Sequence, residues 1–222
     1  MKAGGIDFSG IFRKLRPDFW NAPGLFTAWG FDATSPQWSA AELAGKARAA
    51  GFRWVAVQTT TGMLLGNALA LRDAGLKAVL WGLPGSVWDT NDLFEGYIVQ
   101  IENPDQYREA VHVLPSLPTP RAVVTTFGGE DTKGLVKPLL KYTSTALVEC
   151  YKQDDPIHAD IDRMMWQAAQ YGWPRAHPVL GLYGGIGLGG YVNLGKRQFS
   201  VWTAEEMSDQ DWIDLASHHA QA

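Results

Sequence analysis

Two polar residues, Gln100 and Glu102, stand close together at the end of an apolar run that starts at Gly96. Because side chains along a β-strand alternate between its two faces, both groups point to the same face if this run is a strand. A carboxylate at the end of an apolar strand is costly to bury unless it has partners or a chemical role. Glu102 is therefore the first candidate for acid–base chemistry, with Gln100 as its neighbour.

Other apolar runs of the chain also end on carboxylates, amides and aromatic rings. Two carboxylates can serve as general acid and as base or nucleophile on a glycosidic bond when about 5–10 Å separates them. The candidate catalytic residues are Glu102, Asp32 and Glu149. The candidate substrate-binding residues are Gln100, Gln58, Trp29, Trp81, Tyr151, Tyr183, Trp202 and Glu205. Two alternatives stay open: these acids, Glu102 included, could cap helices or pair with basic residues, and the tryptophans could pack helices onto a sheet.

The elements that must position these residues alternate along the chain. Strands are expected at 25–32, 52–59, 76–82, 96–102, 121–127, 146–151, 178–183 and 198–203. Helices are expected at 39–50, 66–74, 104–113, 132–142, 158–170 and 209–219, with an ill-defined connection at 86–93. Ser39 followed by Glu42 is typical of a capping box at a helix start, and Gly51 is typical of a helix end.

Regular alternation of apolar strands and helices predicts an α/β fold with parallel strand pairing. The number of units favours a small (β/α)8 TIM-like barrel, in which the carboxyl ends of the strands gather the candidate residues at one rim. An open doubly wound sheet is the alternative. We expect residues 1–24 to form a short N-terminal extension and residues 25–222 to form a single barrel.

Composition excludes several classes of protein. With 46% hydrophobic and 19% charged residues the chain is not of the disordered type. A net charge of −4 without a basic block argues against a nucleic-acid partner. No apolar stretch reaches the roughly 18 residues of a membrane span, and no signal peptide is recognised at the start. A cytoplasmic location or assembly into a virion-like particle is therefore expected, and the single cysteine, Cys150, is expected to be buried and inert.

Three short motifs resemble the chitinase class, glycoside hydrolase family 18. The run EGYIVQIENP at 95–104 is similar to the fourth-strand motif of that family in Gly96, Glu102 and Pro104. Residues 199–202 resemble its terminal strand, residues 179–184 resemble its seventh strand, and Tyr151 could match a sixth-strand tyrosine. This resemblance implies a carbohydrate-active barrel that acts on an N-acetylated or cell-wall glycan, with Glu102 as general acid.

The motif departs from the family at two positions, because Gln100 and Ile98 replace acidic residues. Small lysozyme-type barrels of family 25 are closer in size and also carry acids at these strand ends. As general acid, Glu102 would need burial beside Gln100 and an aromatic wall to hold its proton near neutral pH. The alternative function is a non-catalytic glycan-binding or structural barrel in a larger assembly, such as a phage tail-tip or virion protein with assembly partners.

A glycine-rich loop at 184–195 is the other distinctive segment. Residues 185–190 fit the pattern G-x-G-x-x-G, but the sequence that follows is a poor helix start, which a dinucleotide site requires. A phosphosugar site, a mobile loop and tight turns remain as alternatives. The histidines lack the spacing of metal ligands, so neither a metal nor a cofactor is expected.

Overall fold

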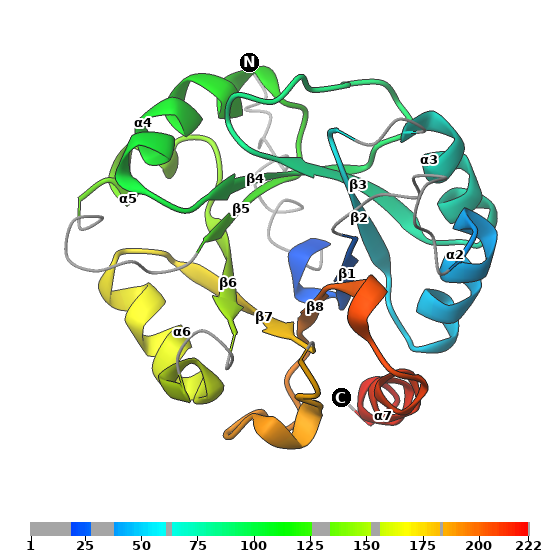
Figure 1. Cartoon of the computed structure of the whole chain (residues 1–222). Helices are drawn as coiled ribbons and strands as arrows, with labels where there is room; N and C mark the ends of the chain where they lie inside the picture. Colours follow the sequence, from blue (N-terminus) through cyan, green and yellow to red (C-terminus); the bar gives the residue numbers. More distant parts are fainter. Residues whose placement is uncertain are drawn as a thin grey trace, which may run out of the picture.

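The chain forms a closed barrel of eight parallel strands (Figure 1). The computed structural model describes residues 19–27, 38–60, 64–125, 134–151, 156–182 and 184–221. Each strand pairs with the next one along the chain, and β8 closes the ring against β1. The strands are β1 Gly24–Phe26, β2 Trp54–Gln58, β3 Lys77–Gly82, β4 Gly96–Ile101, β5 Arg121–Thr125, β6 Thr145–Cys150, β7 Arg175–Gly181 and β8 Ser200–Trp202. The predicted small (β/α)8 barrel is therefore confirmed.

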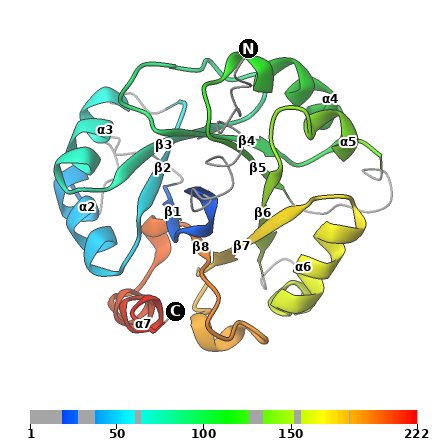
Figure 2. The same cartoon turned by 180° about the vertical axis from the view of Figure 1, so that it is seen from behind.

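Helices stand outside the ring of strands in both views (Figures 1 and 2). They are α2 Ala40–Ala49, α3 Leu64–Asp73, α4 Pro104–Val113, α5 Val136–Leu139, α6 Ile161–Gln170 and α7 Asp209–His219. Short 3-10 turns are η1 Phe19–Asn21, η2 Leu114–Ser116, η4 Pro156–Ala159, η5 Leu188–Gly190 and η6 Ala204–Glu206. Residues 83–95 join β3 to β4 without a helix, which agrees with the ill-defined connection predicted there. In the described residues no helix combines the length and the apolar character that crossing a bilayer demands.

The predicted boundaries of α2 are confirmed by its caps. The Ser39 hydroxyl accepts a hydrogen bond from the Glu42 amide at 3.3 Å, and the Glu42 carboxylate accepts one from the Ser39 amide at 2.7 Å. Gly51 follows the C-cap with φ of +86°, a backbone conformation that favours glycine.

Other boundaries differ from the prediction. β7 begins at Arg175, because residues 175–178 pair with β6 along its length, and the expected start at Pro178 was too late. β8 is confined to Ser200–Trp202. The helix expected over 158–170 is split, since Asp160 caps α6 and a 3-10 turn precedes it. The helix expected over 132–142 is only the four residues of α5 in the described part of that range.

Two apolar clusters hold the barrel together. The larger one lies between strands and helices, and the smaller one fills the interior of the barrel. Strand tilt places inward side chains of alternate strands in shared layers. The strand registers put one residue each from β1, β3, β5 and β7 in a central layer, namely Phe26, Trp81, Val124 and Val179. All four belong to the interior cluster, so the barrel is a packed core.

The turn η1 closes the end of the barrel at which the strands begin, and it lies within the ring of strands in both views (Figures 1 and 2). Its Trp20 is 2% exposed and packs edge-on against Trp54, with 5.6 Å between ring centroids. The Trp20 indole N–H donates to the carbonyl of Arg121 at 3.1 Å. The last part of the predicted 1–24 extension therefore packs onto the barrel, and the division at residue 24 itself stays a prediction.

Candidate functional site

A polar layer lies directly above the central apolar layer, toward the carboxyl ends of the strands. The strand registers place one inward residue each from β2, β4, β6 and β8 in it, namely Gln58, Gln100, Glu149 and Trp202. All four were predicted from the sequence as site residues. We call this layer the mouth layer, because carboxyl ends of strands form the functional face of barrels of this kind.

Gln100 and Glu102 share a face, as their spacing predicts. Gln100 is 9% exposed, and its amide Nε2 donates to Oε1 of Glu102 at 2.7 Å. Glu102 itself is exposed at the rim, where its backbone N–H donates to Oε1 of Gln106 at 2.6 Å. The buried setting expected for Glu102 is therefore wrong. The reason is local: Asn103 caps α4 at once, so the chain turns outward directly after β4.

Glu149 and Tyr151 form a second pair with the same spacing on β6 and just beyond it. The Tyr151 hydroxyl donates to Oε1 of Glu149 at 3.2 Å. Glu149 is 3% exposed and Tyr151 is 7% exposed, so this carboxylate lies inside the barrel. Cys150 between them is buried on the opposite face, as predicted, and its burial raises the pKa of its thiol well above the ordinary range.

Aromatic rings line the inner side of the mouth layer. Trp81 and Trp202 meet edge to face with 4.8 Å between centroids, and Tyr151 lies 6.4 Å from Trp202. Trp81 is 2% exposed, and its indole N–H donates to the carbonyl of Thr27 at 3.1 Å. Its ring therefore packs the interior and supports Trp202, which is half-buried and presents the accessible ring surface.

The remaining predicted site residues fall into two groups. Gln58 is half-buried opposite Trp81 in the register, and Glu205 is a half-buried residue of η6 that accepts a hydrogen bond from the Thr203 hydroxyl. Asp32, Trp29 and Tyr183 lie outside the described residues. In the part of the chain that the structure covers, no group of three or more His, Cys, Asp or Glu side chains gathers as metal ligands.

The glycine-rich loop contains no helix of the kind that a dinucleotide site needs. Residues 184–195 are described, and they hold the three-residue turn η5 and one isolated bridge between Val192 and Asp160. Gly184, Gly185 and Gly195 have positive φ values, and the Tyr191 hydroxyl donates to the carbonyl of Gly181 at 2.7 Å. The loop therefore consists of tight turns, and the hydrogen bond from Tyr191 to Gly181 anchors it to β7.

One inward residue was missed as a candidate. His177 of β7 is 5% exposed and faces the interior two residues before Val179. Extending the pleat of β7 backward from Val179 would have found it, but the strand was expected to begin only at Pro178.

Comparison with known proteins identifies the architecture. No family model matches the sequence, and no curated protein matches it. Solved structures do match. The galactosidase domain of the α-galactosidase–sucrose kinase AgaSK superposes with a TM-score of 0.55 at 10% identity, over 90% of this chain and 40% of that one. The chain has a barrel like those of family 36 α-galactosidases.

Two further structures agree. The α-galactosidase AgaB from Geobacillus stearothermophilus superposes with a TM-score of 0.53 at 8% identity, over 91% of this chain and 41% of that one. An AgaA variant from the same organism, in complex with raffinose, superposes with a TM-score of 0.51 at 10% identity, over 90% of this chain and 41% of that one. This chain thus spans about two fifths of the length of these enzymes. The likeness shows a shared barrel fold, whereas none of the three is of the chitinase or lysozyme type that the motifs resembled.

Proposed function

We propose that the mouth layer binds a glycan and that the barrel is a glycoside hydrolase. The observation that carries this proposal is the convergence of two amides, one buried carboxylate and a half-buried indole in a single layer at the carboxyl ends of the strands. Amides hydrogen-bond sugar hydroxyl and N-acyl groups, while an indole face packs on the apolar C–H face of a sugar ring. The similarity to barrels of α-galactosidases agrees with this substrate class.

The two carboxylates of the proposed site have different surroundings, which suits different roles. Burial disfavours the charged form of a carboxylic acid, and Glu149 lies inside the barrel. Glu102 is at the exposed rim, with the Gln100 amide donating to it. A pair of acids in contrasting environments is how glycosidases separate a proton donor from a charged partner. We therefore assign the general acid to Glu149, and Glu102 becomes the base or charge stabiliser.

This assignment exchanges the roles that the sequence predicted, where Glu102 was the acid. Asp32 stays a candidate for the same partner role as Glu102. An N-acetylated, cell-wall or galactoside-type glycan fits the amide-rich layer. The substrate panel should therefore contain aryl α-galactosides, chitin oligomers and peptidoglycan.

The decisive experiment compares Glu149→Gln with the wild-type protein on this panel. The substitution keeps the shape of the side chain and removes the ionisable proton, so turnover should fall by about 10²- to 10⁴-fold while binding persists. Glu206→Gln, at an exposed position of η6, is the matched control. Turnover by Glu149→Gln at the wild-type rate would eliminate the assigned role.

A second candidate function is glycan binding without cleavage. It is favoured by the two amides at positions 58 and 100, because amides cannot transfer protons as acids do and they outnumber the carboxylate in the mouth layer. Saturable glycan binding to the wild-type protein with no release of reducing ends would select it. The phage or virion setting remains a prediction from the sequence.

A further inference from the structure

A cavity of about 370 Å³ opens at the opposite end of the barrel from the mouth layer. It exists because β7 begins at Arg175, whereas β8 begins at Ser200 and pairs with β7 only from Val179 onward. The first residues of β7 therefore have no paired strand beside them on that side. Its lining comes from η1, α6, β7 and the segment before β8, namely Asn21, Met165, Ala176, His177, Pro178, Arg197 and Gln198.

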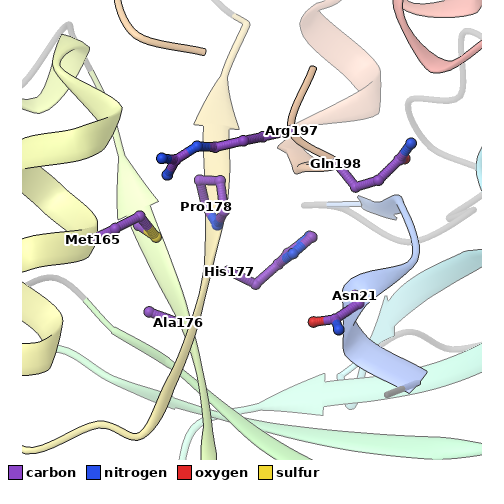
Figure 3. Close-up of a pocket in the computed structure, with 7 residues that line it drawn as sticks. All are labelled: Asn21, Met165, Ala176, His177, Pro178, Arg197 and Gln198. Carbon is purple, nitrogen blue, oxygen red and sulfur yellow. The ribbon is translucent and has the colours of Figure 1, made fainter. Parts of the chain in front are cut away.

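Two residues in the lining of this cavity carry buried polar atoms without partners. Figure 3 shows the imidazole of His177 directed away from β7, toward the side where Asn21 and Gln198 lie. In the described part of the chain, Nε2 of His177 and Oε1 of Gln198 have no hydrogen-bond partner. Buried polar atoms in folded proteins are almost always paired, so two such atoms in the lining of one cavity indicate missing partners.

The inner wall of the cavity is polar but uncharged. Burial, with a smaller contribution from His219, lowers the pKa of His177 to about 3, so its imidazole is neutral at pH 7. A neutral imidazole offers one N–H donor and one acceptor, and Gln198 Oε1 offers an acceptor. The charge of Arg197 is already engaged, because its guanidinium lies 2.5 Å from the Asp162 carboxylate at the exposed edge. Met165, Ala176 and Pro178 supply an apolar wall.

We propose that this cavity is a second binding site, separate from the mouth, for a small uncharged polyhydroxylated molecule such as a free monosaccharide or a polyol. One ligand hydroxyl would donate to Gln198 Oε1 and another would pair with His177 Nε2, while the C–H face of the ligand covers the apolar wall. The volume lies in the range of small-molecule sites. The charged group of the lining, Arg197, is already paired with Asp162, which favours an uncharged ligand over phosphate. This proposal does not depend on the function of the mouth.

The test uses wild-type protein labelled with ¹³C in the methionine methyl groups and in the histidine rings. Galactose, N-acetylglucosamine and glycerol are titrated separately while the NMR signals of Met165 and His177 are followed. We expect saturable shifts of both signals with at least one of these probes, in the millimolar range. Met207 is buried in the outer cluster and not in the cavity wall, so its methyl signal should stay in place.

Two variants separate this site from the mouth. Gln198→Leu removes the unpaired acceptor and should weaken binding about tenfold, whereas Glu149→Gln should leave the titration unchanged. Absence of saturable shifts up to about 100 mM of every probe would overturn the proposal and assign the unpaired atoms to water. Equal binding by Gln198→Leu would overturn it as well, and so would loss of binding in Glu149→Gln. If the mouth layer shows no hydrolytic activity, the NMR shifts expected for the second site are unchanged. The proposal of a hydrolase and the proposal of a second site can therefore fail independently.

Discussion

The hydroxyl of Tyr151 donates a hydrogen bond to the carboxylate of Glu149 across 3.2 Å, and both side chains are more than nine-tenths buried. The same spacing recurs where Gln100 donates to Glu102 at 2.7 Å. Each acid of the proposed site is thus held by a neutral group two residues away. The two pairs differ in depth, since one lies inside the barrel and the other ends at its exposed rim.

Removing the hydroxyl of Tyr151 should change the pH dependence of hydrolysis. A hydrogen bond to a carboxylate favours its charged form, so Tyr151→Phe makes Glu149 hold its proton more strongly. Because a general acid is active when protonated, the alkaline limb of the pH–rate profile should move upward by about half a unit to one unit. Profiles of kcat/KM measure the shift. Tyr142→Phe, at a half-buried position on the outer side, is the control, and an unmoved limb in Tyr151→Phe would contradict the proposed pairing.

A second carboxylate beside Glu102 should make the rim sensitive to pH. In Gln100→Glu the new acid takes the place of an amide that lies 2.7 Å from Glu102, so two negative charges meet at neutral pH. We expect the free energy of unfolding to fall by about 1–2 kcal/mol at pH 8 and to recover near pH 4, where one acid is protonated. Urea titrations at both pH values measure this. Gln106→Glu places an acid at the backbone N–H of Glu102 and tests whether charge alone explains the result.

The start of β1 should tolerate only glycine. A Cβ atom at Gly24 would lie 2.0 Å from the ring of Trp54, which is fully buried and cannot move aside. Gly24→Ala should therefore cost about 3 kcal/mol or prevent folding. Gly45→Ala is the matched control, because nothing lies within 4 Å of its Cβ position and alanine favours the interior of α2. Denaturant unfolding should show a loss for the first variant and a gain of up to about 1 kcal/mol for the second.

His177 should make the fold sensitive to acid. Burial lowers its pKa from 6.5 to about 3. Between these two pH values the imidazole therefore binds a proton in the unfolded chain but not in the folded chain. The contribution of His177 to the free energy of unfolding is fully present above pH 6.5. It decreases by up to a few kcal/mol as the pH falls toward 3. Burial lowers the pKa of His219 as well, which adds to the loss in the same direction.

His177→Gln isolates the contribution of this residue. Plots of unfolding free energy against pH between 7 and about 3.5 should be flatter for His177→Gln than for wild type. His112→Gln, at an exposed position of α4, should follow the wild-type curve. Parallel curves for His177→Gln and wild type would show that the histidine is not buried as the structure has it.

Local rules predicted most of the fold. Ser39 with Glu42 marked the start of α2, Gly51 marked its end, and the helix over Pro104–Val113 has the expected bounds. These features depend on residues within one turn of each other. The start of β7 was predicted too late, because proline usually lies at the edge of a sheet or at the start of a strand. Pro178 is tolerated inside β7 because β8 pairs with β7 only from Val179 onward, so the first part of β7 is locally an edge.

The candidate site was predicted in part. Alternation along single strands was enough to bring Gln100 beside Glu102 and Tyr151 beside Glu149. How deeply each site residue is buried was not predictable, because its exposure depends on neighbours from other strands. Rings from β1 and β8 cover Trp81. Glu102 is exposed to solvent because α4 begins immediately after it.

The aromatic rings that fill the barrel interior also separate its two ends. Trp20, Trp54, Phe26 and Trp81 form a continuous edge-to-face stack from the strand starts toward the mouth layer, so packed rings lie between the two openings. A protein engineer can therefore redesign either entrance as an independent module, since occupancy at one end does not compete sterically with occupancy at the other.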